Sequence, residues 1–125
     1  MKTRREAILA AYEVFQRHER DLAGQLITGL LAIPGLTFYG IKDAARFDQR
    51  TPTVAIRMEG YTPRELATHL GESGIFTWDG NYYAVDLAER LGVQSSGGML
   101  RIGLAHYNTS EEVERLLQEL QKAAK

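Results

Sequence analysis

A single arginine interrupts a run of apolar residues near the C-terminal end of the sequence. The run MLRIGLA (99–105) alternates, so its aliphatic side chains share one face of a predicted strand and Arg101 points to the other. A guanidinium is planar and permanently charged, and it can grip a carboxylate through two parallel hydrogen bonds. The residues alone leave two interpretations open: an ordinary exposed strand arginine, or the anchor of an anionic ligand.

Two further groups of residues could contact a ligand. Tyr82 and Tyr83 lie in the aromatic segment WDGNYY (78–83), which either packs against a neighbouring layer or helps to select a substrate. His106 follows the arginine-bearing strand, and it either touches a substrate or cofactor or serves as a hydrogen-bonded structural histidine. Arg57, on another predicted strand, is interpreted as a solvated or interface arginine.

Other reactive chemistry is missing from the sequence. There is no cysteine, which excludes disulfides, thiolate catalysis and cysteine-ligated metals. His18 and His69 lie on predicted helices with no third ligand in view, so no metal site is expected. The glutamates at 111, 112 and 114 are explained by the start of a helix and form no acid–base pair. We therefore predict no catalytic residue and no metal ligand in this chain.

Hydrophobic periodicity predicts the elements that must position these residues. Apolar residues spaced by three and four predict one long helix from residue 4 to about 32, ended by the Ile-Pro-Gly sequence at 33–35. Thr62 and Thr109 are each followed by a glutamate three residues later, which predicts capping boxes at two more helix starts. The remaining elements are strand 36–41, polar connection 42–50, strand 51–60, the second helix to about 71, strand 75–78, a turn at 79–80, short helix 86–92, strand 99–105 and the last helix.

This order predicts an α+β fold in which a small, mostly antiparallel sheet carries helices packed on one face, with a long N-terminal helix. The 125 residues contain no internal repeat, low-complexity tract or Pro/Gly linker, so we expect a single domain over residues 1–125. If the helices cover the aliphatic face, Arg101 and Arg57 project from an open face. Such a face is typical of one half of an interface.

Charge and hydropathy restrict the expected partners and location. Fifteen basic and sixteen acidic residues leave a net charge of −1, so neither nucleic acid nor an anionic membrane is expected as a partner. The first residues, MKTRREAILAAYEV, are charged and soon broken by Glu13, so they predict neither a signal peptide nor a membrane span. We expect a cytoplasmic protein.

Taken together, these blocks resemble the small C-terminal domain of class V aminotransferases, which are pyridoxal-phosphate enzymes of fold type I, and especially their cysteine desulfurase-like branch. The resemblance covers nearly the whole chain. It rests on four blocks in the family's order: LLAIPGLTFYGI, RTPTVAIRMEGYTPRELATHLGESGI, WDGNYYA and GGMLRIGLAHYNTSEEVERLLQEL. The last block is the most specific, because a strand arginine, Tyr-Asn-Thr and a Glu-Glu-Val helix start follow one another.

The resemblance implies roles for particular residues and partners. In such enzymes the small domain closes the active site, and the arginine of its last strand holds the α-carboxylate of the amino-acid substrate, a position that Arg101 matches. His106, Tyr83 and Tyr82 are weaker candidates for substrate contact. The family's cofactor, pyridoxal phosphate, is bound by a large domain, which would be this chain's partner, and a homodimer is a further expectation.

Two departures from the family limit what the chain alone can do. Tyr83 stands where cysteine desulfurases carry the nucleophilic cysteine, so persulfide transfer by that route is not expected. No lysine lies where a cofactor could bond, so the chain alone is expected to bind no cofactor and to be inactive. The four lysines are terminal or lie in a polar loop: Lys2, Lys42, Lys122 and Lys125.

We expect the chain to be an isolated domain, or the product of a truncated or split gene. The sequence does not select the substrate amino acid, nor does it choose between transamination, elimination, racemisation and desulfuration. An alternative from a different class is a free-standing α+β interaction module that self-associates or binds a protein partner through its open sheet face.

Overall fold

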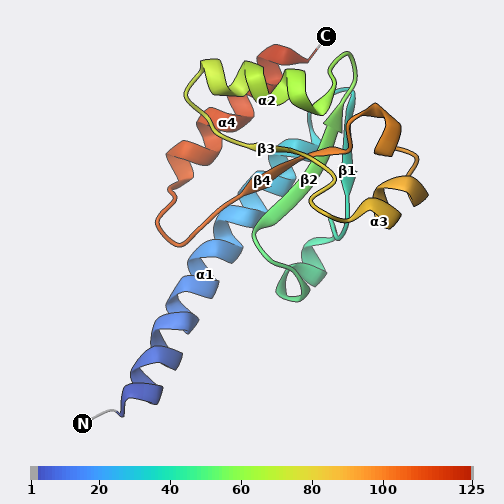
Figure 1. The fold of residues 1–125 in the computed structure, drawn as a ribbon. Coiled ribbons are helices and arrows are strands. Elements are labelled where there is room, and N and C mark those ends of the chain that lie inside the picture. The colour runs from blue at the N-terminus through green and yellow to red at the C-terminus, as the bar shows by residue number, and fades with distance from the viewer. Residues whose placement is uncertain (1–2, 125) are drawn as a thin grey trace.

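The computed structural model describes residues 3–124, which contain one four-stranded antiparallel sheet in the order β1-β2-β4-β3 (Figure 1). The strands are Leu36–Tyr39 (β1), Thr53–Met58 (β2), Trp78–Gly80 (β3) and Met99–Gly103 (β4). The helices are Arg4–Leu31 (α1), Pro63–Glu72 (α2), Val85–Arg90 (α3) and Ser110–Ala123 (α4), with short 3-10 turns at Ala44–Gln49 and Gln94–Ser96. None of the helices in this part of the chain is both long and apolar enough to span a membrane.

The main core lies between one face of the sheet and the helices α1, α2 and α4 (Figure 1). Strands β2 and β4 alternate as predicted, so every second side chain enters this core. Burying one such aliphatic side chain stabilises the fold by about 1.5–3 kcal/mol. The fully buried large residues of the core are Leu26, Ile27, Leu30, Ile56, Leu66, Leu70, Leu100 and Leu120, joined by Val54 and Val113. The predicted α+β class and the long first helix are therefore confirmed.

The opposite face of the sheet is only partly open. A small second cluster forms there from Ala88 of α3, Val93 and Met99, with Tyr39, Ala55 and Tyr82 packed against it. Helix α3 thus covers one part of the face that carries the arginines, while α1, α2 and α4 occupy the other side. The open face is therefore smaller than the alternation of β2 and β4 alone suggests.

Capping boxes define where the helices begin. The hydroxyls of Thr62 and Thr109 accept hydrogen bonds from the backbone amides of Glu65 and Glu112, and each carboxylate reaches back to its threonine's amide. Both predicted boxes are confirmed. A third box, between Thr3 and Glu6, starts α1 and was not predicted. Each box anchors a helix start whose first amides would otherwise lack partners.

The prediction of a strand at 75–78 with a turn at 79–80 is wrong in position. Strand β3 instead includes the Asp-Gly pair, with Trp78 opposite Arg101 and Asp79 opposite Leu100 in β4. The turn follows β3, where the amide of Ala84 donates to the carbonyl of Asn81 at 2.8 Å. An Asp-Gly pair favours a turn locally, but here both residues pair with β4 as part of the strand. The polar connection after β1 also folds further than expected, into the 3-10 turn Ala44–Gln49.

Candidate functional site

Arg101 occupies an inner strand of the sheet and points to its partly open face. In β4 it lies between Ala55 of β2 and Trp78 of β3. The side chain is exposed, and its guanidinium lies over the ring of Tyr82, 4.6 Å from the ring centroid. The two ion pairs found within residues 3–124 are Arg64–Asp79 and Lys122–Glu119, so neither one uses Arg101. Within residues 3–124, no carboxylate forms an ion pair with the Arg101 guanidinium.

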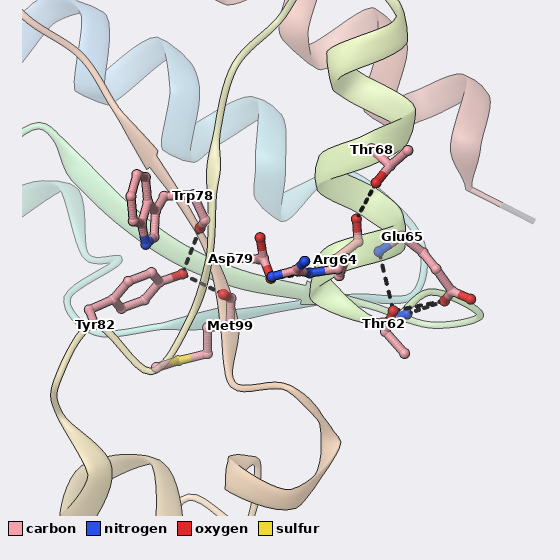
Figure 2. Close-up of polar contacts among 8 residues, drawn as sticks. All are labelled: Thr62, Arg64, Glu65, Thr68, Trp78, Asp79, Tyr82 and Met99. Carbon is pink, nitrogen blue, oxygen red and sulfur yellow. Dashed lines mark hydrogen bonds and ion pairs between the residues drawn. The ribbon is translucent and has the colours of Figure 1, made fainter.

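Tyr82 is a half-buried residue tied to two strands. Its hydroxyl lies 2.9 Å from the carbonyl oxygen of Trp78 in β3 and also hydrogen-bonds to the carbonyl of Met99 in β4 (Figure 2). Burial raises the pKa of Tyr82 to about 12, although the positive charge of Arg101 opposes this rise. The phenol therefore stays protonated near neutral pH and serves as a hydrogen-bond donor, not as an acid or base.

Tyr82 and Tyr83 are consecutive residues in the left-handed region, with φ of 55° and 65°. This conformation is uncommon for bulky side chains and costs free energy that the surrounding structure must offset. Asn81 supplies part of that support, because its side-chain oxygen accepts from the amide of Tyr83 at 3.0 Å and its amide nitrogen donates to Gln94 at 3.3 Å. The two rings therefore have different environments: the Tyr82 ring contacts the Arg101 guanidinium, and Tyr83 is fully exposed.

Arg57 has a different environment from Arg101. It is half-buried, and its guanidinium donates to the carbonyls of Gly98 and, at 3.5 Å, Ser96. These acceptors belong to the segment that leads into β4. The hydrogen bonds of Arg57 therefore stabilise the backbone just before the strand that carries Arg101. Arg57 is therefore not simply solvated, because it is half-buried and hydrogen-bonded to backbone carbonyls. Its alternative interpretation as an interface arginine stays a prediction.

His106 lies against the long first helix. Its ring stacks on Phe15 of α1 at a centroid distance of 4.3 Å and an angle of 27°, and Tyr107 meets it edge-on. The structure brings together Arg101 and Tyr82, whereas the ring contacts of His106 are with Phe15 and Tyr107. A substrate-contacting role for His106 stays a prediction.

Trp78 is the neighbour of Arg101 that the sequence interpretation did not single out. Its side chain is 65% exposed and stands directly across from Arg101 on the same face. The aromatic segment was visible in the sequence, but only the register of β3 on β4 selects Trp78 as the cross-strand partner.

The comparisons with known proteins agree with this architecture. The sequence model of the family "Aminotransferase class-V" matches residues 8–116. The chain belongs to the aminotransferase class-V family. Among its class-V relatives, a probable cysteine desulfurase of Pseudomonas aeruginosa is 33% identical over 106 residues, which cover 85% of this chain and 24% of the relative. The aminotransferase-like protein FGM3 of Gibberella zeae is 30% identical over 113 residues, which cover 88% of this chain and 27% of FGM3.

Solved structures of cysteine desulfurases show the same fold. The apo structure of cysteine desulfurase from Thermococcus onnurineus NA1 has a TM-score of 0.80 at 23% identity, covering 90% of this chain and 26% of that one. The cysteine desulfurase CsdA from Escherichia coli has a TM-score of 0.73 at 28% identity, and the match covers 86% of this chain and 25% of CsdA. The chain thus spans about a quarter of the length of the relatives it matches.

Class-V enzymes use pyridoxal phosphate, which bonds to a lysine amine. Of the lysines within the described residues, Lys122 is on α4, across the sheet from Arg101, and pairs with Glu119 at 2.7 Å. Lys42 follows edge strand β1, which β2 separates from β4. Lys2 and Lys125 lie outside the described residues. The two described lysines therefore do not fit a cofactor site beside Arg101, and no cluster of metal-ligating side chains occurs in residues 3–124.

Proposed function

We propose that this chain acts as the small domain of a pyridoxal-phosphate-dependent class-V enzyme, where it closes the active site and binds the α-carboxylate of an amino-acid substrate through Arg101. The observation that carries the proposal is an exposed guanidinium, fixed on an inner strand, with no carboxylate partner among the described residues. It lies inside the segment that matches the family. In this proposal the cofactor and its lysine belong to a large domain that this chain meets.

The geometry of Arg101 suits a carboxylate. The guanidinium lies over the Tyr82 ring, 4.6 Å from its centroid, and makes no ion pair within residues 3–124. Its N–H groups can therefore supply two parallel hydrogen bonds to a carboxylate. Lysine would retain the charge but would not reproduce the two-point contact.

Tyr83 narrows the chemistry within this proposal. A phenol cannot take up a persulfide sulfur, and the sequence contains no cysteine. We therefore propose that the enzyme acts on an amino acid without a sulfur relay through this domain, and that this domain contributes substrate binding and closure.

The proposal is tested by expressing the chain together with a class-V large domain encoded beside it in its genome. We expect Arg101→Lys to lower kcat/KM for the amino-acid substrate by about ten-fold to a hundred-fold, because a hydrogen bond to a charged group contributes about 1.5–3 kcal/mol. The absorbance of the bound cofactor should not change. Steady-state kinetics and absorbance spectra measure the two effects.

Arg64→Lys is the matched control, because Arg64 is an exposed arginine whose partner, Asp79, lies on the helix-covered side of the sheet. Equal and small effects of Arg101→Lys and Arg64→Lys would contradict the carboxylate role. A genome that encodes no class-V large domain would contradict the assembly itself.

A second candidate is a free-standing interaction module that forms a homodimer or binds another protein. The observation in its favour is the apolar surface on the first half of α1, where Ile8, Leu9 and Tyr12 are 46%, 51% and 58% exposed. Sedimentation equilibrium discriminates between the candidates. A module predicts a dimer of this chain that persists when the large domain is added, whereas a small domain predicts a one-to-one complex with the large domain.

A further inference from the structure

Arg101 contacts an aromatic ring and makes no ion pair within residues 3–124. A guanidinium on a protein surface is commonly oriented by an aspartate or glutamate, and that partner would compete with a substrate carboxylate. The carboxylate nearest in the sheet, Asp79, is directed to the helix-covered side, where it binds Arg64 at 3.1 Å (Figure 2). Arg101 is instead held by an aromatic ring, which attracts the cation without neutralising it.

The ring that holds Arg101 is itself fixed from several directions. Its hydroxyl is bound by carbonyls on β3 and β4, and the residue packs against the cluster formed by Ala88, Val93 and Met99. Its backbone is kept in the left-handed region, at φ 55°. Tyr83 shares the left-handed conformation but is fully exposed, so the contacts around the ring are what set Tyr82 apart.

We propose that Tyr82 is a positioning residue: its ring orients the Arg101 guanidinium so that the N–H edge faces the substrate carboxylate while the positive charge stays available. Trp78 lies directly across from Arg101 on β3 and projects from the same face of the sheet. The inference rests on the proposed role of Arg101 as the carboxylate anchor. It assigns to this aromatic ring the task that an acidic side chain performs elsewhere.

The test uses the full 125-residue chain in solution, with propionate as the carboxylate probe. Side-chain NMR spectra report the ring-current shift of the Arg101 side-chain protons. Backbone spectra report the propionate concentration at which the chemical-shift changes of the β4 amides reach half of their maximum. Three variants are compared: Tyr82→Leu removes the ring, Tyr82→Phe keeps the ring and removes the hydroxyl, and Tyr83→Leu is the matched control. Tyr83 is the same residue type in the same left-handed conformation, but it is fully exposed.

We expect the Arg101 protons to be shifted upfield in the wild-type chain, in Tyr82→Phe and in Tyr83→Leu, and to lose this shift in Tyr82→Leu. Propionate binding should weaken by about two- to ten-fold in Tyr82→Leu, and it should stay within about two-fold of wild type in the other two variants. A merely structural role for Tyr82 would leave propionate binding unchanged in a folded Tyr82→Leu variant, although the ring-current shift would be lost.

Two results would overturn the inference: absence of the upfield shift in the wild-type chain, or unchanged propionate binding in a folded Tyr82→Leu variant. The wild-type measurement decides the matter even if Tyr82→Leu does not fold. Arg101→Lys separates this inference from the proposed function. If that variant binds propionate as well as wild type does, the carboxylate role fails; if it binds weakly while Tyr82→Leu binds normally, only the positioning role fails.

Discussion

Which way each side chain of β3 points decides the chemistry around Arg101. Trp78 and Asp79 are adjacent in sequence but lie on opposite faces, because successive strand residues alternate. Asp79 therefore pairs with Arg64 of α2, and Trp78 stands beside Arg101. A shift of β3 by one residue would place the carboxylate next to Arg101 and occupy the guanidinium.

The raised pKa of Tyr82 gives a prediction about alkaline stability. In the folded chain the pKa of Tyr82 is about 12. It exceeds the ordinary value of 10.0 because burial disfavours the phenolate. The resulting stabilisation is fully present below pH 10 and is lost as the pH rises from 10 towards 12. Reduced for solvent screening, the loss should be about 1 kcal/mol.

Urea unfolding of the wild-type chain and of Tyr82→Phe between pH 8 and about 12 measures this effect. The stability advantage of the wild type over Tyr82→Phe should shrink across the upper part of that range. Tyr83→Phe controls for the loss of an exposed phenol. An advantage that stays constant with pH would contradict the burial of the Tyr82 hydroxyl.

At the scale of elements, two glycines allow β3 to approach the segment that begins β4. Gly98 has φ +74°, and a Cβ placed on it would overlap the carbonyl group of Gly80. The two residues form an isolated bridge next to the β3–β4 ladder. The same Gly98 carbonyl accepts the hydrogen bond from Arg57. This contact sets where β3 ends, and with it the place from which Tyr82 turns back under β4.

Gly98→Ala should therefore destabilise the chain by about 3 kcal/mol or more, because a left-handed backbone and a clash with backbone atoms add together. Gly92→Ala is the matched control, since its φ is +71° and nothing lies within 4 Å of its Cβ position. That control should cost only about 1–2 kcal/mol. Chemical denaturation of both variants gives the comparison, and equal losses would show that the clash is relieved.

At the scale of the whole molecule, the two halves of α1 differ: the C-terminal half packs in the core, and the N-terminal half projects away from it. Its buried residues are Leu22, Ala23, Leu26, Ile27 and Leu30, all in the C-terminal half. The first half extends away from the sheet (Figure 1) and exposes Ile8, Leu9, Tyr12 and Val14. Because an isolated helical segment of this length is marginally stable in water, tertiary packing is expected to protect only the second half.

The two halves of α1 should respond differently to substitution. The double variant Ile8→Gln with Leu9→Gln should stay within about 0.5 kcal/mol of the wild-type stability, whereas Leu26→Ala should cost about 2–5 kcal/mol. Hydrogen exchange should be faster for amides 8–17 than for amides 22–30. A loss above about 1 kcal/mol in the double variant would mean that the first half of α1 is packed in solution, as in a dimer of this chain.

Much of this protein follows from its sequence because the signals involved are local. The span of α1, the alternation of β2 and β4, the threonine–glutamate caps and the face on which Arg101 lies all depend on spacings of two to four residues. These features were predicted before the structure and are present in it. Of the candidate site, the exposure of Arg101 could be predicted in this way.

Only the tertiary structure decided what surrounds that arginine. The register that places Trp78 beside Arg101 joins strands about twenty residues apart, and the Asp-Gly pair locally favours a turn that the sheet overrides. The left-handed backbone of Tyr82 is uncommon for a bulky residue, and the bond from its hydroxyl to Met99 and its packing against Ala88, Val93 and Met99 support it. Those contacts place the ring under Arg101, and no periodicity in the sequence encodes them.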